Sequence, residues 1–97
     1  MKACTRIEIV IEEAQSRHLA NTLEELECGY TMIPRASGSG DRGRRRADDP
    51  TGTFTNCVFV IASDNDELTD QIVDTIRPLL ARSGGICLLS EARWVMH

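Results

Sequence analysis

The sequence predicts an α+β domain with the element order β-α-β-β-α-β, in which two helices cover one face of an antiparallel sheet. Three observations support this prediction: apolar residues alternate in a first segment, recur at helical spacing in two later segments, and form further apolar runs bounded by turn residues. The chain has 97 residues, and 41% of them are hydrophobic. This size and composition indicate a single domain over residues 1–97 with one core.

The first strand and the first helix are predicted within residues 3–28. Three isoleucines alternate along residues 3–11: Ile7, Ile9 and Ile11. This alternation is typical of a half-buried strand. Three leucines then recur at helical spacing in residues 13–28: Leu19, Leu23 and Leu26. They predict a surface helix that packs through one stripe, and Gly29 is expected to end it in a left-handed conformation.

The next two strands are predicted at residues 30–35 and 54–63. Pro34 cannot donate a ladder hydrogen bond, so we expect the first of them at an edge or a strand end. The second is a nearly continuous apolar run, "FTNCVFVIAS", which indicates a well-buried and central strand.

A second helix and a last strand complete the predicted order. Asp64 is expected to cap the helix while Glu67 reaches back to it. The apolar stripe of this helix contains Leu68, Ile72, Ile76, Leu79 and Leu80. Pro78 is expected to kink or end the helix near Arg77. Two glycines at 84–85 then allow a tight turn before the last strand, residues 86–96.

This order is the ferredoxin-like arrangement, in which both helices lie on one side of the sheet. The other side carries Val10, Val58 and Val60 or their neighbours, together with apolar residues of the last strand. An apolar sheet face without a cover needs a partner, and self-association is the simplest one.

Residues 36–53, "ASGSGDRGRRRADDPTGT", form an unusually long connection between the two middle strands, and we call them the glycine–arginine segment. Residues 35–46 contain five arginines and one acid, a local charge of +4 in a chain whose net charge is −4. The rest of the chain therefore sums to −8. This distribution argues against a uniformly basic nucleic-acid-binding domain and favours a local anion site on an acidic body.

The chemistry of the glycine–arginine segment suits a phosphate. Gly38 and Gly40 flank Ser39 and allow backbone amides to turn towards an anion, and the nearby arginines supply planar charged forks. "GSG" is nevertheless neither a Walker loop nor a dinucleotide-binding fingerprint. The alternative is a solvated, charged loop.

Other features limit the classes of function. The four cysteines, Cys4, Cys28, Cys57 and Cys87, show no CxxC pair and no zinc spacing, so reduced thiols are expected and no metal site is predicted. No apolar stretch approaches the roughly 20 residues that span a bilayer, and "MKACTRIEIV" does not read as a signal peptide. We therefore expect a cytoplasmic protein without membrane insertion.

Three segments resemble the PII signalling superfamily: "CGYT" (28–31), "GSGDRGRRR" (38–46) and "SGGICLLSEARWV" (83–95). The spacing G-x-G-x-R-x-x-R is most similar to PII-like proteins of bicarbonate-uptake and carboxysome operons, and above all to the carboxysome-associated type. In this family the long connection is the T-loop, here about 36–53, and the turn before the last strand is the B-loop, here about 82–85.

The resemblance implies a homotrimeric signalling protein, not an enzyme, with adenine nucleotides bound in clefts between subunits. The implied nucleotide-binding residues are Thr31, Gly38, Ser39, Gly40, Arg42, Arg45, Phe59, Gly84, Gly85 and Ile86. Bicarbonate is the implied second ligand, and Gly40, Asp41 and Arg46 are its expected contacts. The T-loop would report energy and inorganic-carbon state to a bicarbonate transporter or a carboxysome component. No tightly bound cofactor is implied.

Departures from the family pattern shape these expectations. Gly85 stands where PII proteins carry a B-loop lysine, and "RWVMH" lacks the C-terminal arginines of those proteins. Both departures favour ADP or AMP over ATP. The T-loop glutamine that supports 2-oxoglutarate binding is also absent.

Three other functions are compatible with this predicted topology. An RNA-binding module would need stacking aromatics on its first and third strands, yet aromatic residues make up only 4% of the chain. A protein-binding module could use the arginine-rich segment alone. An acylphosphatase-type enzyme would need a phosphate loop after the first strand, where the acidic "EEAQSR" stands instead. We therefore expect neither nucleic-acid binding nor catalysis.

Overall fold

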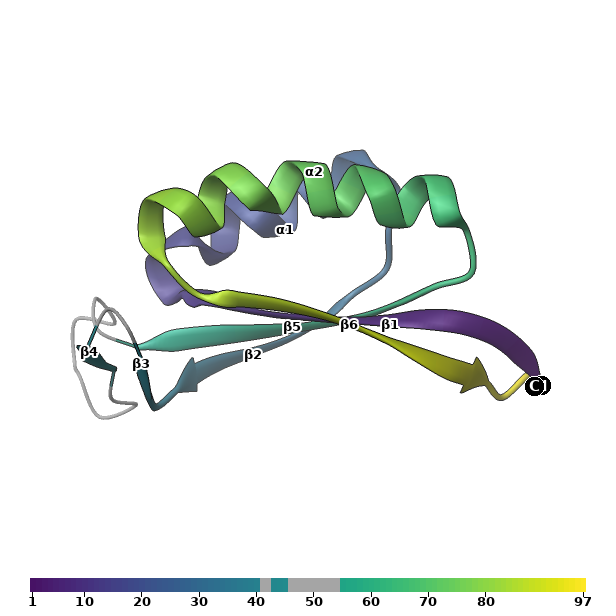
Figure 1. Cartoon of the computed structure of the whole chain (residues 1–97), viewed down its shortest axis with the longest axis horizontal. Helices are drawn as coiled ribbons and strands as arrows, with labels where there is room; N and C mark the ends of the chain where they lie inside the picture. The colour runs from purple at the N-terminus through teal and green to yellow at the C-terminus, as the bar shows by residue number, and fades with distance from the viewer. Residues whose placement is uncertain (41–42, 46–54) are drawn as a thin grey trace.

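The computed structural model describes residues 1–40, 43–45 and 55–97, with Gly40 and residues 43–45 described by their backbone only. An antiparallel sheet has the strand order β2-β5-β1-β6. Its strands are β1 (Lys2–Glu12), β2 (Thr31–Ala36), β5 (Asn56–Ser63) and β6 (Ile86–Trp94). Two helices, α1 (Ser16–Glu25) and α2 (Asp66–Ser83), both cover one face of this sheet (Figure 1). The predicted ferredoxin-like fold is confirmed.

The positions of the middle strands are also confirmed. β5 lies between β2 and β1, as expected for its long apolar run. β2 lies at an edge, where Pro34 deprives no neighbouring strand of a ladder partner. The pairing of β2 with β5 shifts between Ile33 and Ala36, so the chain is irregular around the proline.

The core lies between the sheet and the helices. The side chains that β1 and β5 direct to this side are almost fully buried: Ile7, Ile9, Ile11, Cys57, Phe59 and Ile61. The helices contribute Leu19, Leu23, Ile72, Ile76 and Leu79. Burial of each large apolar side chain contributes about 1.5–3 kcal/mol. The alternation in β1 and the leucine spacing therefore define one core.

The end of α1 differs from the sequence prediction. The helix is shorter than 13–28, because a 3-10 turn, η1 (Glu13–Gln15), precedes α1 and the helix ends at Glu25. Glu27, with φ 56°, takes the left-handed position that was assigned to Gly29. The amide of Cys28 donates to the carbonyl of Leu23 at 2.9 Å, and the amide of Glu27 donates to that of Glu24 at 3.0 Å. These two bonds form a Schellman motif without glycine, so the helix ends earlier than predicted.

The start of α2 also differs. Asn65, not Asp64, is the N-cap residue, and its Oδ1 accepts hydrogen bonds from the amides of Glu67 and Leu68. Asp64 instead forms an ion pair with Lys2, which holds the pKa of that carboxyl below its usual value.

Pro78 neither ends nor interrupts α2, contrary to the prediction. The helix continues to Ser83, and Leu79 in its last turn is buried. Pro78 itself is exposed. The carbonyl one turn earlier can therefore turn to water, which lowers the cost of the missing amide.

The predicted glycine turn after α2 is confirmed. Gly84 has φ 75° and Gly85 has φ 114°, both in the region that side-chain-bearing residues rarely adopt. The turn leads directly into β6.

Among the described residues, no helix covers the second face of the sheet, as expected. Ile33, Ile86 and Leu88 are 51%, 50% and 54% exposed, and Val10, Val58 and Val60 are partly exposed. We call this the open face. None of the helices among the described residues is long and apolar enough to cross a membrane.

Candidate functional site

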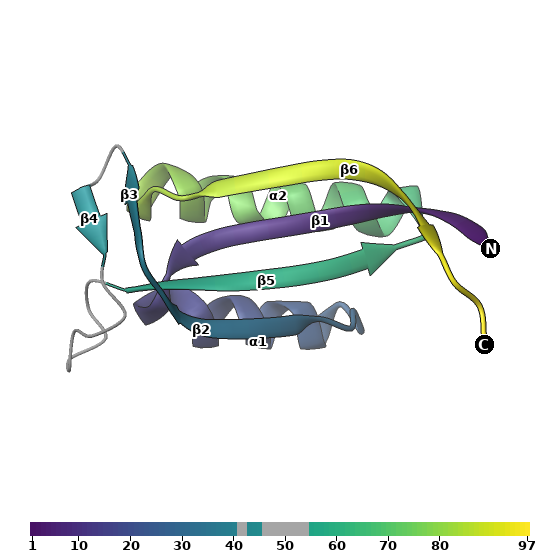
Figure 2. The ribbon, with the colours of Figure 1, turned by 90° about the horizontal axis from the view of Figure 1, so that it is seen from below.

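The two glycine-bearing segments lie at the same end of the sheet (Figure 1). β3 (Gly38–Gly40) leaves the end of β2 and runs across the sheet end towards the β6 edge (Figure 2). The turn of Gly84 and Gly85 precedes β6 at that end. The fold thus brings the two predicted phosphate-binding segments to one end of the molecule.

The local structure of the first segment differs from the expected anion loop. Gly38, Ser39 and Gly40 pair with Arg45, Arg44 and Gly43 of β4 (Gly43–Arg45) in a two-stranded antiparallel ribbon. In such a ribbon the amides point alternately to either side, so they do not converge on one anion. A phosphate at β3 would instead contact single amides together with arginine side chains.

Four predicted site residues are not fully described. Asp41, Arg42 and Arg46 lie outside the described residues, and Arg45 is described by its backbone only. Their contacts with a nucleotide or bicarbonate remain predictions.

The two glycines of the second segment differ in what their backbone amides can contact. The amide of Gly84 donates to the carbonyl of Leu80 at 2.8 Å and therefore caps α2 instead of facing a ligand. A Cβ at Gly85 would lie 2.2 Å from the carbonyl oxygen of Val10, so this glycine is required for the approach of the turn to β1. The amide of Gly85 is the remaining candidate for an anion contact from this pair.

The side chain of Phe59, a predicted nucleotide-binding residue, points into the core and not to a ligand site. Its side chain is 0% exposed, and its ring lies in the core 5.5 Å from the ring of Tyr30. It faces the helices because it stands opposite Ile9 in the register. Only the backbone of Phe59 could therefore face a ligand. The sequence did not indicate this, because the nearly continuous apolar run of β5 does not show which residues point towards the helices.

Thr31 and Ile86 lie on the open face but at opposite edges of the sheet. Thr31 stands opposite Val60 at the β2 edge, and Ile86 stands opposite Val10 at the β6 edge. Three inter-strand spacings of about 4.8 Å separate these edges. A single chain therefore does not gather the two residues around one small site.

A cavity of about 520 Å³ adjoins Thr31, and sequence reasoning missed it. Apolar residues from β5 and β6 line it, including Val60, Ala92 and Trp94, and Arg6 and Arg93 bring positive charge. Its volume is typical of small-molecule sites. No sequence motif marks this cavity, because its lining residues come from four separate segments that the sheet register brings together.

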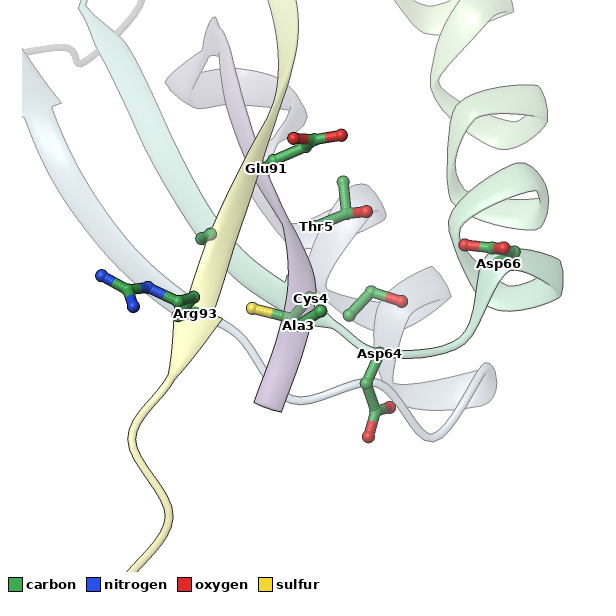
Figure 3. A pocket seen from close by; sticks show the side chains of 9 residues that line it. Ala3, Cys4, Thr5, Asp64, Asp66, Glu91 and Arg93 are labelled. Carbon is green, nitrogen blue, oxygen red and sulfur yellow. The ribbon is translucent and has the colours of Figure 1, made fainter. Parts of the chain in front are cut away.

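A second cavity of about 530 Å³ lies between the ends of β1 and β6 and the start of α2 (Figure 3). Three carboxylates line it, Asp64, Asp66 and Glu91, against one guanidinium, that of Arg93. In Figure 3 the side chain of Arg93 points away from Asp66. This charge balance disfavours an anionic ligand.

Three of the four cysteine thiols are shielded from reaction by their surroundings. Burial raises the pKa of the Cys28 and Cys87 thiols, and burial together with the nearby Glu13 carboxylate raises that of Cys57 to about 11. These thiols therefore stay protonated and unreactive near neutral pH. Within the described ranges, no group of three metal-ligating side chains comes together.

Comparisons with known proteins identify both family and fold. The sequence profile of the nitrogen regulatory protein P-II family matches residues 4–95. A structure of CPII, a nitrogen regulatory PII-like protein from Thiomonas intermedia K12 bound to ADP, AMP and bicarbonate, superimposes with a TM-score of 0.80 at 18% identity and covers 96% of both chains. A PII-like signalling protein from Thermus thermophilus superimposes with a TM-score of 0.71 at 20% identity, covering 97% of this chain and 90% of that one. Among curated proteins, none matches the sequence significantly.

Proposed function

The chain belongs to the nitrogen regulatory protein P-II family, and we propose that it binds ADP or AMP in clefts between neighbouring copies, with bicarbonate as a second ligand. The family is regulatory, so the proposed output is a change in a partner protein and not a chemical reaction. The observation that carries the proposal is the placement of Gly38–Gly40 and Gly84–Gly85 at one end of the sheet in a chain of this family.

Charge supports a phosphate at this end. Residues 35–46 hold a local charge of +4, and two of their arginines, Arg44 and Arg45, pair with β3 in the ribbon. Hydrogen bonds from arginine to phosphate are charge-assisted, and each contributes about 1.5–3 kcal/mol. Gly85, in place of the lysine of PII proteins in the turn before β6, favours a ligand with one or two phosphates over ATP.

The open face supports a site between copies. Thr31 and Ile86 share this face but occupy opposite edges, so a cleft that uses both needs the β2 edge of one copy and the β6 edge of another. The half-exposed Ile33, Ile86 and Leu88 would be buried by the same association. A homotrimer, the assembly of PII proteins, satisfies both requirements.

Bicarbonate is a small anion that fits beside the phosphates in the same positive region. Its proposed contacts are Gly40, Asp41 and Arg46, through backbone amides and one guanidinium. The solved CPII structure bound to ADP, AMP and bicarbonate supports this choice of second ligand. The proposed receivers of the signal are a bicarbonate transporter or a carboxysome component that touches the glycine–arginine segment.

Calorimetric titration tests the proposal. AMP, ADP and ATP are each titrated into the purified protein, with and without bicarbonate, and into the Arg42→Ala and Arg45→Ala variants. Arg77→Ala, an exposed arginine on α2, is the matched control for loss of positive charge. We expect one nucleotide per chain, tighter binding of ADP or AMP than of ATP, and about tenfold weaker binding in either loop variant.

Two results would overturn the proposal. Absence of binding for all three nucleotides would remove the nucleotide function and leave the arginines for docking to a protein or to nucleic acid. We also expect bicarbonate to tighten nucleotide binding, because both ligands would order the same segment. Equal affinities with and without bicarbonate would remove this coupling.

A further inference from the structure

Glu13 contacts the chain on both sides of the glycine–arginine segment. Its Oε1 accepts a hydrogen bond from the backbone amide of Arg35 at 2.8 Å, and its Oε2 accepts one from the hydroxyl of Thr55 at 2.8 Å. The amide of Glu13 also donates to the carbonyl of Thr55 at 2.9 Å. Glu13, which directly follows β1, thus connects the end of β2 to the residue that precedes β5.

The backbone at Arg35 explains why such a contact is needed. Arg35 has φ 60°, a left-handed conformation that is unfavourable for a residue with a side chain. It follows Pro34 at the point where the pairing of β2 with β5 shifts. A hydrogen bond to a carboxylate is charge-assisted and therefore among the strong ones, so it can offset this cost. Residues in such conformations persist where their surroundings over-determine them.

The left-handed turn at Arg35 changes the direction of the chain. β2 ends at Ala36, and β3 then crosses the sheet end towards the β6 edge (Figure 2). Gly38 at the start of β3 lies close to Asn56, so that a Cβ on it would stand 3.3 Å from Nδ2. The course of β3 towards Gly84 and Gly85 therefore begins at the residue that Glu13 holds.

We propose that Glu13 is a positioning residue for the nucleotide end of the sheet: it fixes Arg35 and Thr55, and so directs β3 towards the turn of Gly84 and Gly85. It does not touch the ligand itself. The effect on ligand binding rests on the proposed nucleotide function, whereas the effect on β3 does not. Sequence reasoning could not find this role, because Glu13 is one of two adjacent acids in "IEEAQSR" and its partners lie 22 and 42 residues away.

Glu13→Ala and Glu13→Gln separate positioning from charge. Alanine removes both side-chain hydrogen bonds. Glutamine keeps both, because its amide oxygen accepts from the amide of Arg35 and its NH2 donates to the hydroxyl of Thr55. Glu25→Ala is the matched control: it removes an exposed glutamate from the end of α1. Thr55→Val is a milder second variant, because it removes one hydroxyl at nearly constant volume.

The first measurement needs no ligand. NMR in the apo protein records hydrogen exchange of the Arg35 amide and the nuclear Overhauser effect between the Gly38 α-protons and the Asn56 side-chain amide. We expect both protection and Overhauser effect in the wild type, Glu13→Gln and Glu25→Ala. In Glu13→Ala we expect the Overhauser effect to disappear and protection to fall at least tenfold, with the Gly84 and Gly85 signals unchanged. Retention of both signals in Glu13→Ala would overturn the proposal.

The second measurement is ADP affinity. Glu13→Ala should bind about tenfold more weakly and Thr55→Val about threefold, whereas Glu13→Gln and Glu25→Ala should stay within about twofold of the wild type. Unchanged affinity in Glu13→Ala, or equal losses in the alanine and glutamine variants, would overturn the positioning role. A wild type that binds no nucleotide would instead refute the proposed function, and the NMR result would still decide what Glu13 does for β3.

Discussion

The two faces of the sheet use the same strands but have different partners. On the face under α1 and α2, every large side chain of β1 and β5 is almost fully buried. On the open face, Val10, Val58 and Val60 of the same two strands are only partly buried, and the edge strands add Ile33, Ile86 and Leu88, about half exposed. The covered face therefore defines the fold of one chain, whereas the open face presents apolar side chains for the proposed association with a second copy. Only the core under the covered face is formed entirely within a single chain.

The comparison also separates the predicted ligand residues. Phe59 lies on the covered face and belongs to the core, whereas Thr31 and Ile86 lie on the open face and remain available. The proposed ligand site therefore uses the open face and the sheet end, where the glycines lie. The covered face contributes stability and backbone geometry.

Phe59→Ala should show the largest effect of the difference between the two faces. Removal of a fully buried ring should lower the free energy of unfolding by about 3–5 kcal/mol, because a cavity remains in the core. Thr31→Ala, at an exposed position on the open face, should stay within about 0.5 kcal/mol of the wild type and should change nucleotide affinity instead. Urea unfolding of both variants measures this contrast. Similar stabilities for the two variants would contradict the assignment of Phe59 to the core.

Gly85→Ala is the next test, at the edge where the covered sheet meets the glycine turn. An added Cβ would stand 2.2 Å from the carbonyl oxygen of Val10, and φ 114° is unfavourable for alanine. We expect a loss of about 2–3 kcal/mol in the free energy of unfolding. Gly29→Ala is the matched control, because nothing lies within 4 Å of its added Cβ. If the two substitutions cost the same, the close approach of the turn to β1 would be refuted.

The covered face could be predicted from the sequence because its signals are local and periodic. Ile7, Ile9 and Ile11 alternate, and apolar residues of α1 and α2 recur each turn, so the order of elements along the chain and the core follow from spacing. The predicted ends of α1 and α2 were wrong where another interaction outweighed the local sequence rule. Glu27 replaced the expected glycine in a Schellman motif, and the packing of Leu79 carried α2 through Pro78.

The candidate site could be predicted only in part, because it depends on contacts distant in sequence. The glycines marked both segments, and the family resemblance gave them a role. The bonds of Glu13 to Arg35 and Thr55, and the cavity beside Thr31, arise from the sheet register and not from any motif. The hydrogen-bonded ribbon of β3 and β4 likewise could not be told from an open loop by composition, since glycine and arginine suit both.

Leu88→Arg should have the smallest effect on the fold of a single chain and the largest on assembly. Leu88 stands opposite Glu8 on the open face, whereas its neighbour Leu89 stands opposite Ile7 on the helix side. The two leucines are 54% and 50% exposed, so Leu89→Arg is a control of equal exposure on the other face. Light scattering should show Leu88→Arg as one chain and Leu89→Arg as three, with circular dichroism unchanged in both, since exposed substitutions shift stability by about 0.5 kcal/mol or less. An assembled Leu88→Arg together with a dissociated Leu89→Arg would place the interface on the helix side and would require a different cleft for the nucleotide.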